Sequence, residues 1–163
     1  MPCFKQNQTL ANTTRKFEAA MPIKTPDGFE PIIAGEDVSF ETHVGPLFRK
    51  LDVPEKLAVW GFQAEQHHCN PYGVLHGGMA VALADTMMGS LVFHAIGGAP
   101  CATISLNTEF IAAAKSGEWI EGRAELLRQG RSVCFVRAEL FAGDKRIMTA
   151  SGAWAIIGAK QSL

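Results

Sequence analysis

The chain has 163 residues, of which 47% are hydrophobic and 19% are charged, and its formal net charge is −1. These values fit one globular domain with a buried core, and a charge so close to zero gives no reason to expect general binding to nucleic acid. The four cysteines (Cys3, Cys69, Cys101 and Cys134) are scattered without a CxxC pair. In a chain of this length they are expected to be reduced thiols, which favours a cytoplasmic location.

Residues 1–40 are expected to form an N-terminal extension, partly irregular, ahead of a domain that spans residues 41–160. The start of the chain is rich in Pro, Gly, Thr, Asn and Lys without periodicity, so it is expected to be loose or to lie over the domain. It has no apolar stretch before a small-residue cleavage site, and no secretory signal is expected. Residues 42–51 could hold a short helix, but Gly45 and Pro46 weaken that expectation.

A strand and a long apolar helix are predicted in the middle of the chain. Residues 56–66 alternate between two faces, as a strand does, and residues 67–73 form a loop marked by Asn-Pro and Gly. The helix is expected from about Gly77 to Ala95 and ends before Gly97 and Gly98. It approaches membrane-spanning length, but Asp85 lies inside it, and an Asp at mid-membrane costs roughly 2.5–3.5 kcal/mol. A buried helix in the core of a soluble protein is therefore expected, and not a transmembrane helix.

The remainder of the chain has the pattern of an antiparallel meander. Residues 119–128 alternate cleanly, with Ile120, Gly122, Ala124 and Leu126 expected to face inward. Turn residues at 129–131 follow this segment, and turn residues at 143–145 separate the next two predicted strands. The four predicted strands are residues 102–111, 119–128, 132–141 and 146–157.

This order of elements predicts an α+β architecture. A helix that is apolar all round must be covered on every side, and one sheet covers only one side. The simplest arrangement is a curved antiparallel β-sheet wrapped around the long central α-helix, with a second subunit covering the rest. That arrangement is the hotdog fold, in a homo-oligomer.

Asp85 is the first candidate for chemistry, since it is the only charged residue between His76 and His94. A carboxylate on a buried helix is costly unless it has partners or a task. The alternative is an Asp held by backbone amides or by nearby hydroxyls such as that of Thr86.

The second candidate is the start of the helix, where His76 precedes Gly77 and Gly78. The backbone N–H groups of a helix start are unpaired, and glycines allow close approach of a ligand. With the helix dipole behind them, these amides suit the developing oxyanion of an acyl transfer, for which one donor contributes roughly 3–4 kcal/mol. Alternatively, the two glycines only permit close packing of the helix on the sheet.

The spacing of these two candidates predicts a shared active site. Asp85 lies eight residues after Gly77, which is about 12 Å along a helix axis. Groups that act on one carbonyl must lie within about 3–4 Å of it. Two helices from two subunits can meet this requirement, so we expect Asp85 of one subunit to face the Gly77 amide of the other.

Other polar residues have weaker signals. Asn70, before Pro71, could hold water or orient a thioester, or could simply form a turn. His67, His68, Cys69 and His76 lack any established zinc spacing, so no metal site is expected, and no nucleophilic role is favoured for Cys69. Basic residues flank a predicted turn and could bind the phosphates of coenzyme A, or could form a solvated hairpin tip. The residues of this turn are Arg128, Gly130, Arg131 and Ser132.

The stretch from Asn70 through His76-Gly77-Gly78, followed by Asp85, resembles the PaaI-like branch of hotdog-fold acyl-CoA thioesterases. The similarity continues through residues 98–100, 103–107 and 130–132 and covers roughly residues 60–157. The resemblance implies that Asp85 acts as general base or nucleophile and that the Gly77 amide polarises the thioester carbonyl. It implies that Asn70 and His76 orient substrate and water.

The resemblance also implies supporting roles for residues on the strands. Thr103 stands where the family often has a serine that assists the Asp. Gly78 and the turn formed by Arg128, Gly130, Arg131 and Ser132 lie where such enzymes bind substrate and its coenzyme A moiety. The expected activity is hydrolysis of an acyl-CoA to free acid and coenzyme A, with no metal and no redox cofactor. The alternatives are a non-catalytic acyl-CoA-binding hotdog protein, a hydratase and a structural oligomer, and the acyl group is open.

Overall fold

The structure is a computed structural model that describes residues 23–32 and 39–158. Most of the predicted N-terminal extension, and the last residues of the predicted domain, lie outside this part of the chain. The division into an extension and a domain therefore stays a prediction. The elements, in chain order, are β1 (Phe29–Pro31), α1 (Phe40–Val44), β2 (Phe48–Lys50), β3 (Leu57–Gln63), the short 3-10 helix η1 (Gln66–His68), α2 (Gly77–Ala95), β4 (Cys101–Phe110), β5 (Trp119–Gln129), β6 (Val133–Ala142) and β7 (Lys145–Ile156).

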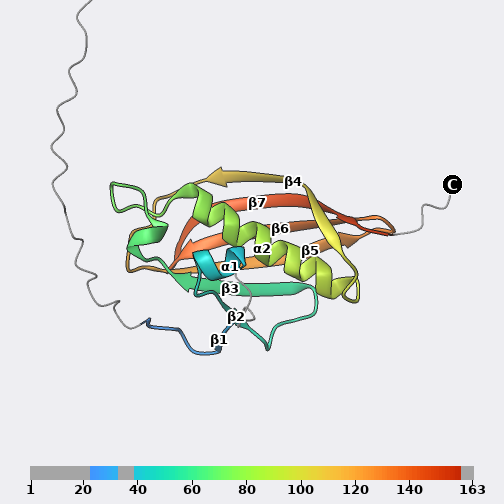
Figure 1. The fold of residues 1–163 in the computed structure, drawn as a ribbon, viewed down its shortest axis with the longest axis horizontal. Helices are drawn as coiled ribbons and strands as arrows, with labels where there is room; N and C mark the ends of the chain where they lie inside the picture. The colour runs from blue at the N-terminus through green and yellow to red at the C-terminus, as the bar shows by residue number, and fades with distance from the viewer. Residues whose placement is uncertain (1–22, 33–38, 159–163) are drawn as a thin grey trace, which may run out of the picture.

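The strands form one 7-stranded antiparallel sheet in the order β1-β2-β3-β5-β6-β7-β4, and α2 lies across one face of it (Figure 1). The α+β class and the hotdog arrangement predicted from the sequence are confirmed. The predicted inward face of β5 is also confirmed, since Ile120, Gly122, Ala124 and Leu126 are all buried. The chain leaves β3, passes through α2 and enters the sheet again at the far edge as β4.

The central helix α2 buries one stripe of apolar side chains against the sheet, at the spacing expected of a helix that packs on one side. Its length and composition alone would also fit a membrane span, with mean hydropathy 1.3, but the buried stripe is that of a core helix. The opposite face, which includes Asp85 and Phe93, is only half-buried or exposed. The buried stripe consists of Met79, Ala80, Leu83, Ala84, Met87, Met88, Leu91 and Val92.

Three short elements before β3 differ from the expectation. The short helix expected near residues 42–51 is present as α1. It ends at Val44, just before Gly45 and Pro46. Strands β1 and β2 were not predicted, and β1 lies inside the expected extension, paired with β2. With three residues each, these strands are too short to show a period of two.

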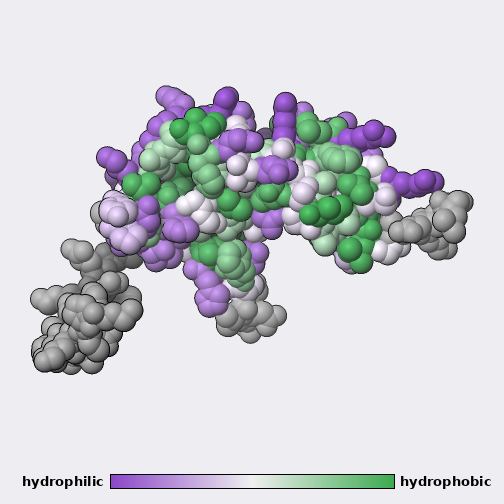
Figure 2. Space-filling model, turned by 90° about the horizontal axis from the view of Figure 1, so that it is seen from above, coloured by the Kyte–Doolittle hydropathy of each residue, from purple (hydrophilic) through white to green (hydrophobic). Residues whose placement is uncertain are grey.

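Strand β4 forms one edge of the sheet and pairs only with β7 among the described strands. Most of its side chains are exposed, including the large apolar side chains of Ile104 and Phe110. From above, apolar surface is interspersed with polar surface along this edge (Figure 2). A long exposed edge strand with apolar side chains is a surface that proteins usually cover or pair.

Candidate active site

Asp85 is held in place by Thr103, across the gap between α2 and β4. The Thr103 hydroxyl donates a hydrogen bond to Asp85 Oδ1 over 2.9 Å. Within the described residues, Oδ2 has neither a hydrogen-bond partner nor an ion pair. The hydroxyl that binds the carboxylate is therefore that of Thr103 and not that of Thr86, and one carboxylate oxygen is left available for substrate or water.

His76 caps the start of α2 and makes its first two amides unequal. His76 Nδ1 accepts a hydrogen bond from the Gly78 amide over 2.9 Å, as an N-cap side chain does. A neutral His76 ring then carries its proton on Nε2, because Nδ1 is the acceptor. No acceptor in the described part of the chain binds the Gly77 amide, so it is the amide that remains available for a ligand.

The Phe110 ring lies against Gly77 at the end of β4. A Cβ atom built on Gly77 would come within 3.1 Å of that ring, which explains locally why a glycine begins the helix. The Phe110 side chain is 59% exposed, so it covers the free amide from one side without closing the site. Sequence reasoning missed Phe110, since only the strand register brings it to the helix start.

Asp85 and Gly77 lie on one unbroken helix, as predicted. Their separation is therefore about 12 Å along the helix axis, and each has its own neighbour on β4. Asp85 contacts Thr103 near the start of the strand, and Gly77 lies by Phe110 at its end. The two groups of one chain cannot act on one carbonyl.

Asn70 forms a turn with its side-chain oxygen. Its Oδ1 accepts hydrogen bonds from the amides of Tyr72, over 3.0 Å, and Val74, over 3.2 Å. The turn-forming alternative considered for Asn70 is thus present in the structure. These hydrogen bonds fix the orientation of the Asn70 amide group. Its NH₂ has no hydrogen bond to the described residues. The role of Asn70 toward a substrate stays a prediction.

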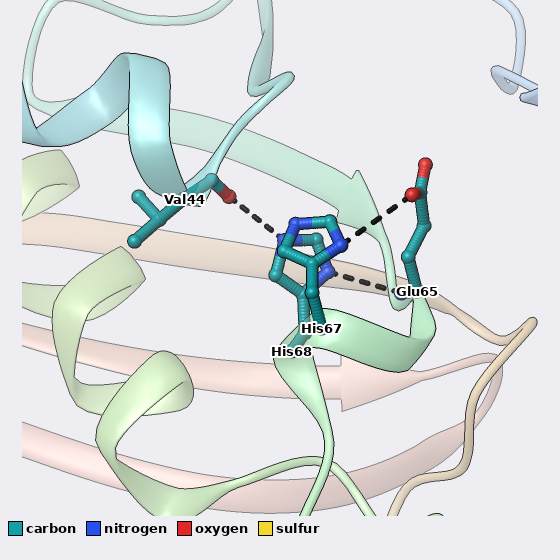
Figure 3. A network of polar contacts seen from close by, with 4 residues as sticks. All are labelled: Val44, Glu65, His67 and His68. Carbon is teal, nitrogen blue, oxygen red and sulfur yellow. Dashed lines mark hydrogen bonds and ion pairs between the residues drawn. The ribbon is translucent and has the colours of Figure 1, made fainter. Parts of the chain in front are cut away.

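His68 links α1 to the loop before α2 (Figure 3), and its backbone also contacts the start of α2. Its Nε2 donates to the Val44 carbonyl over 2.9 Å, and its Nδ1 accepts from the Glu65 amide over 3.0 Å. Its own carbonyl accepts from the amide of His76 over 2.9 Å. Burial, together with the neighbouring His67 ring, lowers the pKa of His68 to about 4, so the ring is neutral at physiological pH.

The predicted coenzyme A turn is an exposed hairpin tip between β5 and β6. The Gly130 amide donates to the Val133 carbonyl over 2.8 Å, while Arg128, Arg131 and Ser132 are exposed. The Ser132 carbonyl binds the amide of Ile156, which pairs with the first residue of β4. The turn is therefore at the Asp85 end of β4, and the Gly77 end lies roughly 20 Å further along the strand.

Two hollows open on the face of α2 that points away from the sheet. The first, of about 350 Å³, lies at the helix start and is bordered by His76, Gly78 and Met79; we call it the N-terminal hollow. The second, of about 470 Å³, contains Asp85 and Thr103; we call it the Asp85 hollow. Short helix α1 borders both, a role that the sequence did not indicate because α1 itself was barely predicted.

The thiols and imidazoles near the loop have no catalytic or metal-binding arrangement. Burial raises the pKa of the Cys69 thiol, which opposes formation of a thiolate nucleophile. Cys69, Cys101 and Cys134 are free thiols, and Cys3 lies outside the described residues. Among the residues that the structure describes, no three His, Cys, Asp or Glu side chains are placed to hold a metal ion.

Comparison with known proteins identifies related chains. A model of the thioesterase superfamily matches residues 72–149. Mouse acyl-coenzyme A thioesterase 13 is 33% identical over 87 residues, which are 53% of this chain and 61% of the mouse protein. A phenylacetic acid degradation-related protein from Ralstonia eutropha JMP134 is 34% identical, with a TM-score of 0.61 over 66% of this chain and 82% of that one. Zebra fish thioesterase superfamily member 2 is 28% identical, with a TM-score of 0.68 over 74% of this chain and 88% of that one.

Proposed function

Because the chain belongs to the thioesterase superfamily, we propose that it hydrolyses acyl-coenzyme A thioesters at an active site shared by two subunits. The observation that carries the proposal is the state of Asp85. Its carboxylate is held by Thr103 and borders an open hollow, on a helix that has no other acidic residue. A half-desolvated carboxylate with one free oxygen is suited to remove a proton from water or to attack a carbonyl.

The Gly77 amide supplies the complementary half of the chemistry. It is the first N–H of α2 and remains without an acceptor because the His76 side chain takes the Gly78 amide instead. A thioester carbonyl oxygen bound there would gain negative charge in the tetrahedral state, where the N–H donor and the helix dipole stabilise it most. The thiolate of coenzyme A then leaves, and the free acid dissociates.

Two subunits are required because one α2 cannot bring both groups to one carbonyl. The exposed face of α2 and the exposed edge strand β4 form the surface that a second copy would cover. In this dimer Asp85 of one subunit faces Gly77 of the other, and Thr103 orients that Asp85. Asp85 either removes a proton from the attacking water or attacks the carbonyl carbon itself. In the second route the thiolate leaves an acyl–Asp85 anhydride, which water then hydrolyses, so both routes give the free acid and coenzyme A.

The test is release of free thiol from a set of acyl-CoA substrates, followed with a thiol-reactive dye. Asp85→Asn keeps the size of the side chain and removes its charge, so we expect turnover to fall by roughly 10²–10⁴-fold. The matched control is Asp144→Asn, the same change in an exposed turn, which should leave turnover unchanged. Thermal unfolding of each variant shows that the fold is kept.

Equal hydrolysis by wild type and Asp85→Asn would refute the role of Asp85. Binding of acyl-CoA by the wild type without any thiol release would instead identify a non-catalytic acyl-CoA-binding protein of the same fold.

A further inference from the structure

Helix α1 forms a wall across the exposed face of α2. Its residues Phe40, His43 and Val44 border the N-terminal hollow, while Glu41, the residue after Phe40, borders the Asp85 hollow. α1 therefore separates the two hollows along α2. It lies before residues 72–149, which carry the superfamily match.

The wall is fixed to the start of α2. Buried His68 donates from Nε2 to the Val44 carbonyl at the end of α1, and its backbone carbonyl binds the His76 amide next to Gly77. One residue thus sets the position of α1 and the position of the free amide. The wall and the helix start therefore share His68 as a common anchor.

The acyl group and the coenzyme A moiety of an acyl-CoA need different surroundings. The N-terminal hollow is bordered by Phe40, Val44, Met79 and Ala82, together with imidazole rings, and suits an apolar group. The coenzyme A arm is long, polar and anionic and needs basic residues. The exposed Arg128 and Arg131 lie at the Asp85 end of β4, which in the proposed dimer belongs to the partner of the subunit that supplies Gly77.

The N-terminal hollow has room for part of an acyl chain. One water molecule takes about 30 Å³ in the liquid, and a methylene group is of similar size, so the hollow of about 350 Å³ corresponds to on the order of ten non-hydrogen atoms. The hollow is open to solvent in the single chain, so a longer acyl group has to extend beyond it, and Phe40 of α1 is one of the side chains at its border.

Resting on the proposed thioesterase function, we infer that the N-terminal hollow is the acyl pocket and that Phe40 of α1, with Ala82 of α2, sets the size of acyl group it accepts. Phe40 is an exposed large side chain at the border of this hollow, and Ala82 is a small, half-buried residue that also lines it. The enzyme should accordingly prefer octanoyl-CoA to palmitoyl-CoA.

Two variants change the pocket in opposite directions and are tested on acetyl-, octanoyl- and palmitoyl-CoA. Ala82→Phe fills the pocket, so kcat/KM for octanoyl-CoA relative to acetyl-CoA should fall at least about tenfold, the usual effect of a misfit in an apolar pocket. Phe40→Ala opens the pocket, and kcat/KM for palmitoyl-CoA relative to octanoyl-CoA should rise by a similar factor. Since Phe40 is already exposed, its truncation leaves the core intact.

Phe135→Ala is the matched control, because Phe135 is exposed to a similar degree on β6 and borders neither hollow. It should keep the wild-type ratios. Unchanged ratios in both Ala82→Phe and Phe40→Ala, or a wild-type preference for palmitoyl-CoA, would overturn the acyl-pocket assignment while hydrolysis that depends on Asp85 still stands. Absence of hydrolysis of every substrate by the wild type would instead overturn the proposed function itself.

Discussion

His68 is the one polar side chain that is buried in the core of the described structure, with 3% of its surface exposed. Both ring nitrogens are used, one as a donor to α1 and one as an acceptor from the loop. A second proton on this ring would break the acceptor bond and place a charge in the core. The buried ring therefore makes the stability of the protein sensitive to acid.

The pH dependence follows from the lowered pKa of His68, about 4 compared with 6.5 in the unfolded chain. Above pH 6.5 the ring is neutral in both states. As the pH falls from 6.5 to 4, the unfolded chain binds a proton that the folded chain does not, so the free energy of unfolding decreases by up to about 3 kcal/mol. Urea unfolding between about pH 4 and about pH 7, a range that spans both pKa values, measures this change.

His68→Gln should lose most of that pH dependence and should also be less stable than the wild type at neutral pH. His94→Gln, the same change at an exposed histidine, should retain the wild-type slope. An equal slope in wild type and His68→Gln would show that other groups cause the acid sensitivity.

Gly77 and Gly78 show how neighbouring identical residues can differ in function. Their sequence positions suggest the same property, an open amide at a helix start. The structure separates them, because the His76 ring binds one amide and leaves the other free. The side-chain rotamer of an N-cap residue decides which backbone amide it binds. The hydrophobic periodicity of the sequence does not indicate this rotamer.

At the scale of elements, Gly122 of β5 sets how closely α2 packs on the sheet. A Cβ atom at this position would lie 2.9 Å from Met87 Cε and 3.5 Å from Leu83 Cδ2. We expect Gly122→Val to destabilise the protein by about 1–3 kcal/mol, because overpacking forces the helix or its side chains to move. Urea unfolding at neutral pH provides the measurement.

The control for Gly122→Val is Ser151→Val, at an exposed position of β7. It introduces the same side chain without contact to α2 and should change the stability little. If Gly122→Val were as stable as the wild type, the close helix–sheet approach at Gly122 would not be a determinant of stability.

The long elements could be predicted from the sequence because each repeats its pattern several times. α2 combines nineteen residues with an apolar composition and a glycine pair beyond its end, and β5 alternates over its buried half. The short elements α1, β1 and β2 contain at most one and a half repeats of their period. Their existence depends on tertiary contacts, such as the hydrogen bond from His68 to Val44.

The same distinction holds for the candidate site. Asp85, Thr103 and Gly77 could be identified because they belong to a local motif or stand out by type. Phe110 and Phe40 could not, because each reaches the site through register or packing between distant segments. The sequence also indicated the turn at Gly130 but not its position near the Asp85 end of β4.

At the scale of the whole molecule, the proposed active site between two subunits predicts complementation between two inactive variants. Asp85→Asn lacks the carboxylate, and Gly77→Val blocks the amide because its side chain would collide with the Phe110 ring. A mixed dimer contains one site with an intact Gly77 and an intact Asp85. Equal co-expression should therefore restore about one quarter of the wild-type activity, since half of the dimers are mixed and each has one complete site of two.

Each variant expressed alone should be nearly inactive, and size-exclusion chromatography should show that both form the same oligomer as the wild type. A co-expressed mixture with no more activity than its parents would contradict an active site built from two subunits.

The continuity of α2 has a regulatory consequence. Because one rigid rod carries both reactive groups at a fixed spacing, a solitary polypeptide holds two incomplete catalytic halves. In the proposed dimer, dilution below the dissociation constant would then switch the protein off without any inhibitor, and protein concentration would decide when thioesters are cleaved. The geometry of a single helix would thus make protein concentration the control variable of catalysis.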